Sequence, residues 1–429
     1  MTPAYLLLAG MSLLLAAQAA YSAALMLYAW EDDEKPRQGG APGLFEPPRH
    51  RFTLILPARH EEAVIGDTIR RVVELDYPRD LVEVLVVIEA GDTGTIAKVA
   101  ETLAGLRREG VAHVRLLTFA DPPINKPHGL NVGLRAARGD VVAIFDAEDE
   151  PHPAILSVVD TVMAREGIPA VQCGVQLMNY GDRWFSALNV LEYFFWFRSR
   201  LRYHARVGAI PLGGNTVFIR RDLLARLGGW DDRCLTEDAD IGIRLSAAGV
   251  PVRVLYDDRY VTREETPPTT GQFLRQRTRW NQGYLQVLGK GDWRRLPARP
   301  QRLLAFYTLA FPLFQALTVL YLPVSLWLIV AVKVPVLVAI LSSLPCYMLL
   351  LQIAIGLVGL YEFTGAHGLR PRPLSPVRLV AAYLPYQWLL GFAAFRAVWR
   401  QARGVNTWEK TAHVGAHRGH MNHEVRSVK

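Results

Sequence analysis

The sequence predicts an α/β domain, built on a mixed but mainly parallel β-sheet, with α-helical transmembrane segments at both ends of the chain. Hydrophobic residues make up 51% of the 429 residues and gather toward the two ends, whereas the middle has the composition of a soluble domain. In that middle, apolar runs of strand length alternate with helical spacing, the pattern of a parallel sheet. We expect an N-terminal anchor and linker, a central domain, C-terminal transmembrane and interfacial helices, and a basic tail, at 1–48, 49–300, 301–400 and 401–429.

The first apolar segment, residues 4–30, contains no charged residue and is long enough to cross the hydrocarbon core of a membrane. The alternative is a cleaved signal peptide, which would have basic residues ahead of a shorter apolar stretch. No basic residue precedes Glu31. We therefore predict a membrane anchor that is retained.

Four strands separated by helical segments are expected in the first part of the central domain, within 51–59, 81–92, 114–119 and 140–151. The carboxyl ends of parallel strands meet at one edge of a sheet, and ligands bind there in open α/β folds. Polar residues follow three of these strands, at 57–59, 89–92 and 146–149. We expect these three groups to lie together.

The stretch FDAEDEP at 145–151 places four acids within five residues, directly behind an apolar strand. Carboxylate oxygens without sulfur ligands suit Mg²⁺ or Mn²⁺, and such ions commonly bridge the phosphates of a nucleotide. The alternative is a solvated acidic loop before a helix, because Asp and Glu stabilise helix N-termini. Taken alone, the cluster leaves both interpretations open.

Two later stretches are equally ambiguous when each is taken alone. LTEDADIGIRLSAAG (235–249) opens an amphipathic helix with acids, which a capping box at Thr236 would also explain. QRTRWNQGYLQ (276–286) is basic and aromatic and stands just before the apolar C-terminal third. Arg and Trp are common at membrane interfaces, so contact with lipid headgroups is the alternative for this second stretch.

In this order, and between membrane segments, the strand-terminal acids, TED and QxxRW resemble the membrane-bound glycosyltransferase family 2. That family includes cellulose, hyaluronan and poly-N-acetylglucosamine synthases, and ceramide glucosyltransferases. The resemblance covers about residues 50–300 and the arrangement of membrane segments around them. It implies a GT-A (Rossmann-like) fold, a nucleotide-diphosphate sugar as donor, with a UDP-sugar expected first, and an inverting transfer that depends on Mg²⁺ or Mn²⁺.

The resemblance implies roles for the acids. Asp238, the last residue of TED, would be the general base that takes the proton of the acceptor hydroxyl as it attacks the anomeric carbon. Asp146 and Glu148 match the D-x-D acids that hold the metal and the diphosphate, and Asp149 would share that role or take it over. Asp92 matches an acid that helps to hold the nucleotide base, although this chain lacks the paired acids that the family has there.

The family pattern also implies a donor site and an acceptor site around these acids. Arg279 would stabilise the leaving diphosphate, and Trp280 offers an apolar face to a sugar ring, with a membrane-interface role as the alternative for both. The turn PLGGNTVFIRR (211–221) resembles an acceptor-side turn of the family or is an ordinary turn. The expected donor-site residues are Asp92, Lys126, Asp146, Glu237, Gln276, Arg277 and Arg279. The expected acceptor-site residues are Trp280, Gly214 and Asn215.

The stretch 183–208 is dense in aromatic residues, with Arg at both ends. It suits an amphipathic helix that lies in the membrane interface and lines the entrance for the acceptor. The alternative is a core helix of the central domain.

Nucleotide sugars are cytosolic, so the central domain is expected on the cytosolic side of the plasma (inner) membrane. Residues 306–363 are long enough for two spans. A further full span at 379–399 would put the basic tail outside, contrary to the excess of Lys and Arg in cytosolic segments. We therefore expect 379–399 to be re-entrant or interfacial. Three spans within 303–363 are the alternative.

The resulting hypothesis is a processive synthase that extends a β-linked polysaccharide and passes it through its own membrane channel. The alternative is a single transfer to a lipid acceptor, such as ceramide or a polyprenyl phosphate, and the small number of spans favours it. A non-enzymatic scaffold would not need Asp238 or the acid cluster, and both are present.

The charge and the cysteines bear on the possible partners and on the kinds of site. The net charge of +8 is concentrated beside the apolar segments and in the tail, which fits anionic membrane lipids better than nucleic acid. The three cysteines lie far apart, so the sequence supports neither a disulfide framework nor a zinc site.

Overall fold

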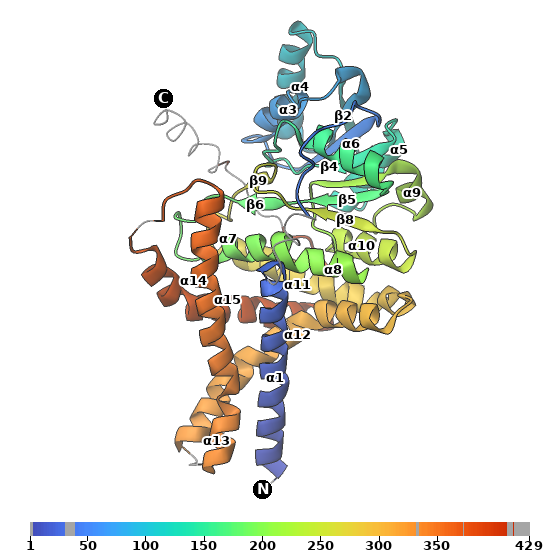
Figure 1. The fold of residues 1–429 in the computed structure, drawn as a ribbon. Coiled ribbons are helices and arrows are strands. Elements are labelled where there is room, and N and C mark those ends of the chain that lie inside the picture. The colour runs from blue at the N-terminus through green and yellow to red at the C-terminus, as the bar shows by residue number, and fades with distance from the viewer. Residues whose placement is uncertain (1–2, 31–38, 332–333, 372, 410–414, 416–429) are drawn as a thin grey trace.

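The computed structural model describes residues 3–30, 39–331, 334–371, 373–409 and 415. An α/β part lies at the top of Figure 1. Below it lie α1 (Pro3–Leu27), α12 (Arg299–Ala331), α13 (Val336–Ser342) and α14 (Leu344–Ala366), which are called the membrane-side helices below. Between the two parts lie α7 (Ser186–Phe195), α8 (Leu201–Val207) and α11 (Thr270–Lys290). The molecule is therefore layered, with the sheet at one end and the most apolar helices at the other.

The main sheet has seven strands: β1 (Phe52–Ala58), β2 (Val82–Glu89), β3 (Val114–Phe119), β4 (Val141–Ile144), β5 (Ala170–Cys173), β7 (Val217–Arg220) and β8 (Val252–Leu255). Their order is β3-β2-β1-β4-β7-β5-β8. Only β7 runs antiparallel to its neighbours, β4 and β5, and the other pairings in this sheet are parallel. The predicted mixed, mainly parallel sheet is confirmed. A small second sheet pairs β6 (Val175–Leu177) with β9 (Thr262–Glu264) in parallel.

The strands are apolar on both faces because helices cover both faces of the sheet. Leu54 and Leu56 of β1 belong to one core, and Ile55 between them belongs to the other. Side chains alternate between the two faces along a strand, so a strand covered on both sides has a continuous apolar sequence. The helices of the α/β part are α3 (Ile65–Val73), α4 (Thr93–Arg108), α5 (Lys126–Ala136), α6 (Ile155–Glu166), α9 (Arg221–Arg226) and α10 (Glu237–Ala247).

The stretch 183–208 forms α7, a π turn (Trp196–Arg200) and α8 in direct succession, at the junction of the two parts. Ser199 Oγ accepts a hydrogen bond from Ala29 N at 2.9 Å and donates one to Leu25 O at 3.0 Å, which fastens this helix to the end of α1. Phe194 and Leu201 are buried. The burial matches the core-helix alternative, while the contacts with α1 and α14 place the helix where the membrane-side helices begin.

Three described helical segments are long and apolar enough to cross a membrane: Tyr5–Trp30, Arg299–Ala331 and Val336–Ala366. They confirm the prediction of apolar helices at both ends of the chain, one near the N-terminus and two in the C-terminal part. Large apolar side chains on them point outward, for example Leu7, Leu320 and Leu350. An extended apolar surface of this kind indicates contact with lipid.

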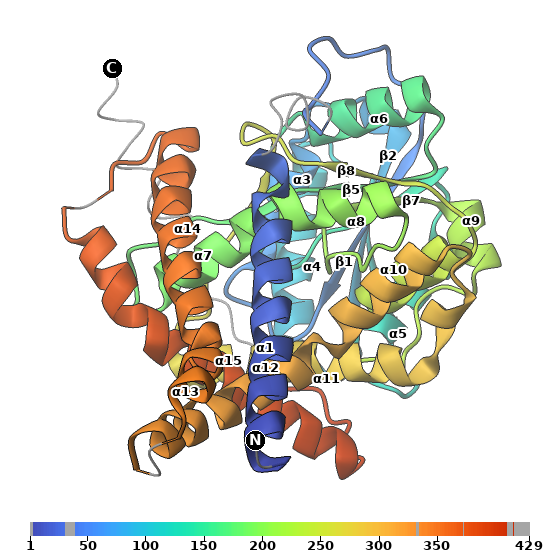
Figure 2. The same cartoon turned by 60° about the horizontal axis from the view of Figure 1, so that its bottom comes forward.

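Helix α15 (Ser375–Ala402), which contains the segment 379–399, is not among these three. Figures 1 and 2 show it crossing the direction of α14. One face packs on α11 and α12 and buries Tyr386, while another face exposes Trp388 and Trp399. An exposed apolar face that carries tryptophan is typical of a helix lying in the membrane interface, which supports the interfacial prediction for this segment.

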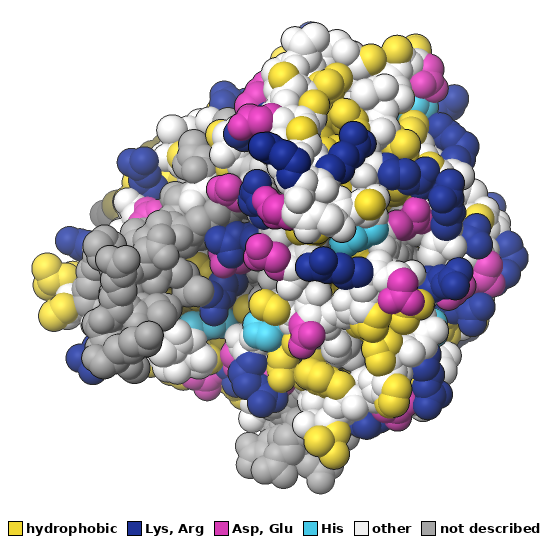
Figure 3. Space-filling model, turned by 90° about the horizontal axis from the view of Figure 1, so that it is seen from above, with side chains coloured by type: hydrophobic (Ala, Val, Ile, Leu, Met, Phe, Trp, Pro, Cys, Tyr) yellow, Lys and Arg dark blue, Asp and Glu magenta, His cyan; other side chains and the backbone are white. Residues whose placement is uncertain are grey.

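The end of the molecule remote from the membrane-side helices is charged. Figure 3 shows this end from above, with Lys and Arg side chains interspersed with Asp and Glu over the α/β part. A surface of mixed charges suits a domain that stands in water. The two ends of the molecule therefore suit different solvents.

Candidate active site

A cavity of about 760 Å³ lies between the carboxyl ends of the first strands and the membrane-side helices. Most of the site residues predicted from the sequence line it: Lys126, Asp146, Glu148, Gly214, Asn215, Glu237, Asp238, Gln276, Arg277, Arg279 and Trp280. The two that do not are Asp92 and Asp149. Segments far apart in the sequence thus contribute to one space.

Lys126 joins the acids of two motifs. It is the first residue of α5, whose N-terminus is capped because Asn125 Oδ1 accepts a hydrogen bond from His128 N. Its Nζ lies 2.5 Å from Asp146 Oδ1 and 3.9 Å from Glu237 Oε1. Burial would lower the pKa of Lys126, but these two carboxylates more than offset it, so the pKa lies above its usual value. Lys126 is therefore a fixed cation beside the acid cluster.

Asp149 stabilises the acidic loop through hydrogen bonds and does not itself line the cavity. It is fully buried, and its oxygens accept hydrogen bonds from Asp146 N at 2.8 Å and from Asn215 Nδ2 at 2.7 Å. Burial and the neighbouring Glu264 raise its pKa well above the usual value. In this arrangement Asp149 orients the Asp146 backbone and Asn215, whereas Asp146 and Glu148 are the members of the cluster that reach the cavity wall.

Glu264, the last residue of β9, is a cluster member that the sequence analysis did not identify. It lines the cavity and is hydrogen-bonded to Asn215 and Asp149. Burial raises the pKa of Glu264 to about 7, and Glu148 adds to the shift. No local pattern marks this residue, because it reaches the cluster from a strand more than a hundred positions away.

This donor set fits a divalent cation. Asp146, Glu148 and Glu264 present only carboxylate oxygens to the cavity, and the charges of Glu148 and Asp146 add to the rise that burial causes in the pKa of Glu264. One lysine stands among them. Hard oxygen ligands with excess negative charge are the chemistry that Mg²⁺ and Mn²⁺ prefer, so these three residues would hold the ion.

Asp238 lies on α10 and faces the turn that carries Gly214. Its Oδ1 accepts a hydrogen bond from Ala239 N at 2.7 Å. A Cβ atom on Gly214 would lie 3.2 Å from Asp238 Oδ2, so the glycine lets the backbone pass close to this carboxylate. Burial raises the pKa of Asp238, while the Ala239 N–H and Lys126 act in the opposite direction. A carboxylate with a raised pKa is a stronger base at neutral pH.

The two arginines of QxxRW have different environments on α11. Arg277 is bound by Glu192 and Asn189, and its Cζ lies 4.7 Å from the ring centroid of Trp280. Arg279 lines the cavity, where Glu237 and Asp238 counter the loss of pKa that burial causes. Both arginines line the cavity, but Arg277 is ion-paired with Glu192 and packs on Trp280, so Arg279 is the one of these two that can face an anion.

Trp408 is a further residue to which the sequence analysis gave no role. It lines the cavity, and the Cζ of Arg279 lies 4.4 Å from its ring centroid. The segment that carries it is fastened to α15 and α11, since Arg400 donates to Thr407 O at 2.8 Å and Gln286 donates to Asn406 Oδ1 at 3.1 Å. The tail of the chain therefore contributes a wall of the site.

Replacing Trp408 with alanine is expected to lower kcat/KM for the donor by about twofold to thirtyfold, because a cation over an aromatic ring is stabilised by ~0.5–2 kcal/mol. Steady-state kinetics on the purified protein would measure it. Trp408→Phe keeps an aromatic face and should retain most of the activity. Wild-type kinetics in Trp408→Ala would show that the contact does not position Arg279.

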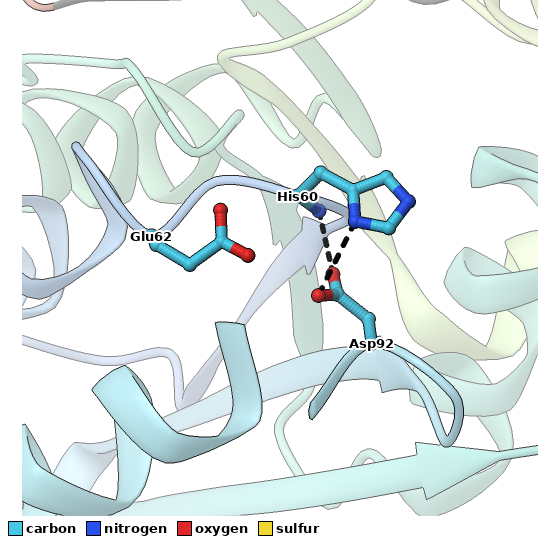
Figure 4. Close-up of side chains that lie close together, drawn as sticks. All are labelled: His60, Glu62 and Asp92. Atoms are coloured by element: carbon cyan, nitrogen blue, oxygen red, sulfur yellow. Dashed lines mark hydrogen bonds and ion pairs between the residues drawn. The ribbon is translucent and has the colours of Figure 1, made fainter. Parts of the chain in front are cut away.

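Asp92 does not reach the cavity. It is buried at the N-terminus of α4, where it accepts hydrogen bonds from Thr95 N at 3.2 Å and from His60 N at 2.5 Å. Figure 4 shows Asp92 beside His60 and Glu62. One potential metal-ligand atom from each of these three side chains lies within 4.8 Å of the other two. The role of Asp92 toward a nucleotide base stays a prediction. Glu89, at the end of β2, lies on the cavity wall instead.

The chain was compared with known families and proteins. A family model described as "Glycosyltransferase like family 2" matches residues 48–283, more than half of the chain. The "Probable glycosyltransferase YdaM" of Bacillus subtilis is 30% identical over 246 residues, 56% of each protein. A beta-monoglucosyldiacylglycerol synthase of Trichormus variabilis is 29% identical, over 54% of this chain and 49% of that protein. A poly-beta-1,6-N-acetyl-D-glucosamine synthase of Staphylococcus epidermidis is 23% identical over 63% of each.

The chain spans about half the length of the first two of these relatives. Among solved structures, a mannosyltransferase from Pyrobaculum calidifontis in complex with GDP-Man and Mn²⁺ matches with a TM-score of 0.57 and 23% identity, covering 92% of this chain and 99% of that one. This last similarity concerns the fold.

Proposed function

The chain belongs to glycosyltransferase family 2 and has a GT-A fold, and on that basis we propose that it transfers a sugar from a nucleotide-diphosphate sugar to the hydroxyl group of a membrane lipid. The transfer would be inverting and would depend on Mg²⁺ or Mn²⁺. The family membership makes the chain a glycosyltransferase. The donor, the acceptor and the stereochemistry are parts of the proposal.

One observation favours a lipid acceptor, namely that the cavity is continuous from the acid cluster to the membrane-side helices. The same space that Asp146 and Asp238 line is bounded farther on by side chains of α1, α12, α14 and α15. Apolar residues predominate there, among them Leu15, Phe311, Val319, Leu322, Leu349 and Leu384. A lipid could therefore place its apolar part between these helices while its hydroxyl group reaches the carboxylates.

The residues of the site suit an in-line displacement. Asp238 would take the proton of the acceptor hydroxyl as that oxygen attacks the anomeric carbon. The diphosphate would leave on the opposite face of the sugar, which inverts the configuration. Lys126 and Arg279 would counter the negative charge that develops on it, and Trp280 would support the sugar ring. A bound divalent cation would supply further neutralisation of the diphosphate.

The same proposal implies on which side of the membrane the α/β part lies. Nucleotide sugars are made in the cytosol, so the α/β part would face the cytosol and α15 would lie in the interface on that side of the plasma (inner) membrane. The relatives named above include a glycolipid synthase and a polysaccharide synthase.

A processive polysaccharide synthase is the second candidate, and one observation favours it. Helices α1, α12, α14 and α15 each place a glutamine on the cavity wall: Gln18, Gln315, Gln352 and Gln387. Amide groups both donate and accept hydrogen bonds, so these four side chains could contact the hydroxyl groups of a sugar chain on its way through the membrane.

The test is a transfer assay on the full chain in nanodiscs with Mn²⁺ and a panel of radiolabelled nucleotide sugars. Label in organic-extractable lipid would support the lipid acceptor. Label in high-mass, glycosidase-sensitive material would replace it with the processive candidate. Label in neither fraction, with native lipid extract present, would contradict both.

The acid cluster predicts that metal activation depends on pH. The pKa of Glu264 is raised to about 7, so below that pH a proton competes with the cation for the cluster. The KM for Mn²⁺ should fall by about tenfold in all as the pH rises from about 6 to about 8, with most of the fall below about pH 7. Initial rates at varied Mn²⁺ would measure it. Glu264→Gln should flatten this dependence, and equal slopes in the two proteins would refute the assignment.

A further inference from the structure

Arg200 is a cation in the part of the cavity next to the membrane-side helices. It lies in the π turn between α7 and α8 and lines the cavity. Its Nη2 donates to Ser22 Oγ at 2.6 Å and to Ser22 O at 3.4 Å, on α1. Ser22 lies in the last third of the segment Tyr5–Trp30, toward the α/β part. The guanidinium is therefore near the depth at which lipid headgroups meet a membrane-spanning helix.

The other arginines of this helix are engaged elsewhere. Arg198 Nη1 lies 3.0 Å from Glu362 Oε2, Arg202 donates to Tyr256 O, and Arg206 donates to Tyr28 Oη at 3.2 Å. None of these three lines the cavity. Among the arginines of this stretch, Arg200 is the one that the fold directs into the cavity.

Arg200 has no carboxylate partner within ion-pair distance among the described residues. Glu192 is the acid that acts on it, and Glu192 is itself bound by Arg277. Burial lowers the pKa of Arg200, but a guanidinium remains protonated in proteins. Arg200 is half-buried, and a charge partly removed from water is costly without a counter-ion, so an anion entering the cavity would gain from this position.

Arg200 and the proposed base, Asp238, line one and the same cavity. Tyr284 of α11 lines the same cavity; burial raises its pKa, Asp238 adds to the shift, and Arg277 and Arg200 act against it. Tyr284 thus lies within electrostatic reach of both groups. A headgroup with an anion near Arg200 could place a hydroxyl near Asp238.

We propose that Arg200, with Ser22, binds the phosphate of an anionic, hydroxyl-bearing phospholipid and so selects it as the acceptor. This inference rests on the proposed lipid-directed transfer and specifies its substrate class. Arg200 and phosphate can form paired hydrogen bonds, which a neutral diacylglycerol would not provide. The phosphate would hold the headgroup while the apolar chains occupy the space between α1, α12 and α14.

Binding can be tested without catalysis, by the thermal unfolding of the full chain in detergent. The probes are dihexanoyl phosphatidylglycerol, dihexanoylglycerol and inorganic phosphate. We expect phosphatidylglycerol to raise the unfolding temperature of the wild type and to bind about tenfold to hundredfold more weakly to Arg200→Gln. Arg200→Lys should keep part of the affinity, and Arg206→Gln, which removes a cation outside the cavity, should keep all of it.

Three results would overturn the inference: an unchanged response of Arg200→Gln, an equal response of the wild type to dihexanoylglycerol, or an equal response to inorganic phosphate alone. The unfolding temperatures of the variants without a probe would show whether each one folds. If Arg200→Gln does not fold, Arg200→Lys provides a second test.

Transfer assays separate this inference from the proposed function. Two results together would support both the proposed function and this inference: the wild type labels phosphatidylglycerol, and the KM for phosphatidylglycerol is about tenfold higher or more in Arg200→Gln. Labelling of diacylglycerol in preference to phosphatidylglycerol would overturn the inference and leave lipid-directed transfer intact. Label in no lipid, together with Arg200-dependent binding of phosphatidylglycerol, would refute the proposed function and leave an anionic-lipid site.

Discussion

Replacing Asp238 with asparagine is expected to lower kcat by about 10²- to 10⁴-fold and to leave donor binding nearly unchanged, because general-base catalysis contributes about that much. The amide has almost the same shape and can still accept the hydrogen bond from Ala239 N, but it cannot take a proton. Single-turnover transfer to the acceptor, with donor affinity from equilibrium binding, would measure the two effects separately.

Asp240 provides the matched control, two residues along the same helix and therefore on its opposite side. It is buried, and its carboxylate is bound by Arg244 at 2.8 Å and by Lys290. Asp240→Asn should therefore lower the free energy of unfolding, by about 3 kcal/mol, with little change in kcat per folded molecule. Comparable kcat values in Asp238→Asn and the wild type would exclude Asp238 as the base.

The first half of the sheet could be predicted because its strands are covered on both faces. The expected strands at 51–59 and 81–92 correspond to Phe52–Ala58 and Val82–Glu89. Continuous apolar runs mark such strands plainly. The placement of β7 between β4 and β5 could not be predicted, since the order of strands depends on contacts between distant segments and no short stretch of sequence encodes it.

The candidate site was predictable where a residue stands in a motif with a fixed place on the fold. Asp146 follows a strand and Asp238 begins a helix, and both positions direct a carboxylate to the same edge. Glu264 and Trp408 have no such marker, because they reach the site only through the pairing of β6 with β9 and the packing of the tail. Asp149 belongs to the same motif as Asp146 and Glu148 but does not line the cavity. The motif alone could not predict this, because the conformation of the loop decides which acids face the cavity.

Removal of divalent cations is expected to lower transfer by about 10³-fold or more, because metal stabilisation of a leaving diphosphate contributes several kcal/mol. Asp146→Asn should have a similar effect, since Asp146 lines the cavity and supplies one of the carboxylates that would hold the ion. Rates after treatment with EDTA, followed by titration with Mn²⁺ and Mg²⁺, would measure the first effect. The same titration of Asp146→Asn would measure the second.

Glu150 is the control within the same acidic stretch, because it does not line the cavity and its Oε1 lies 2.6 Å from Arg71 Nη1. Glu150→Gln should keep the metal response of the wild type. If the treated wild type stays fully active and Asp146→Asn is nonetheless inactive, the essential partner of Asp146 is Lys126, which lies 2.5 Å from it. The acid cluster would then serve to position a cationic side chain against the diphosphate, and catalysis would not require a metal ion.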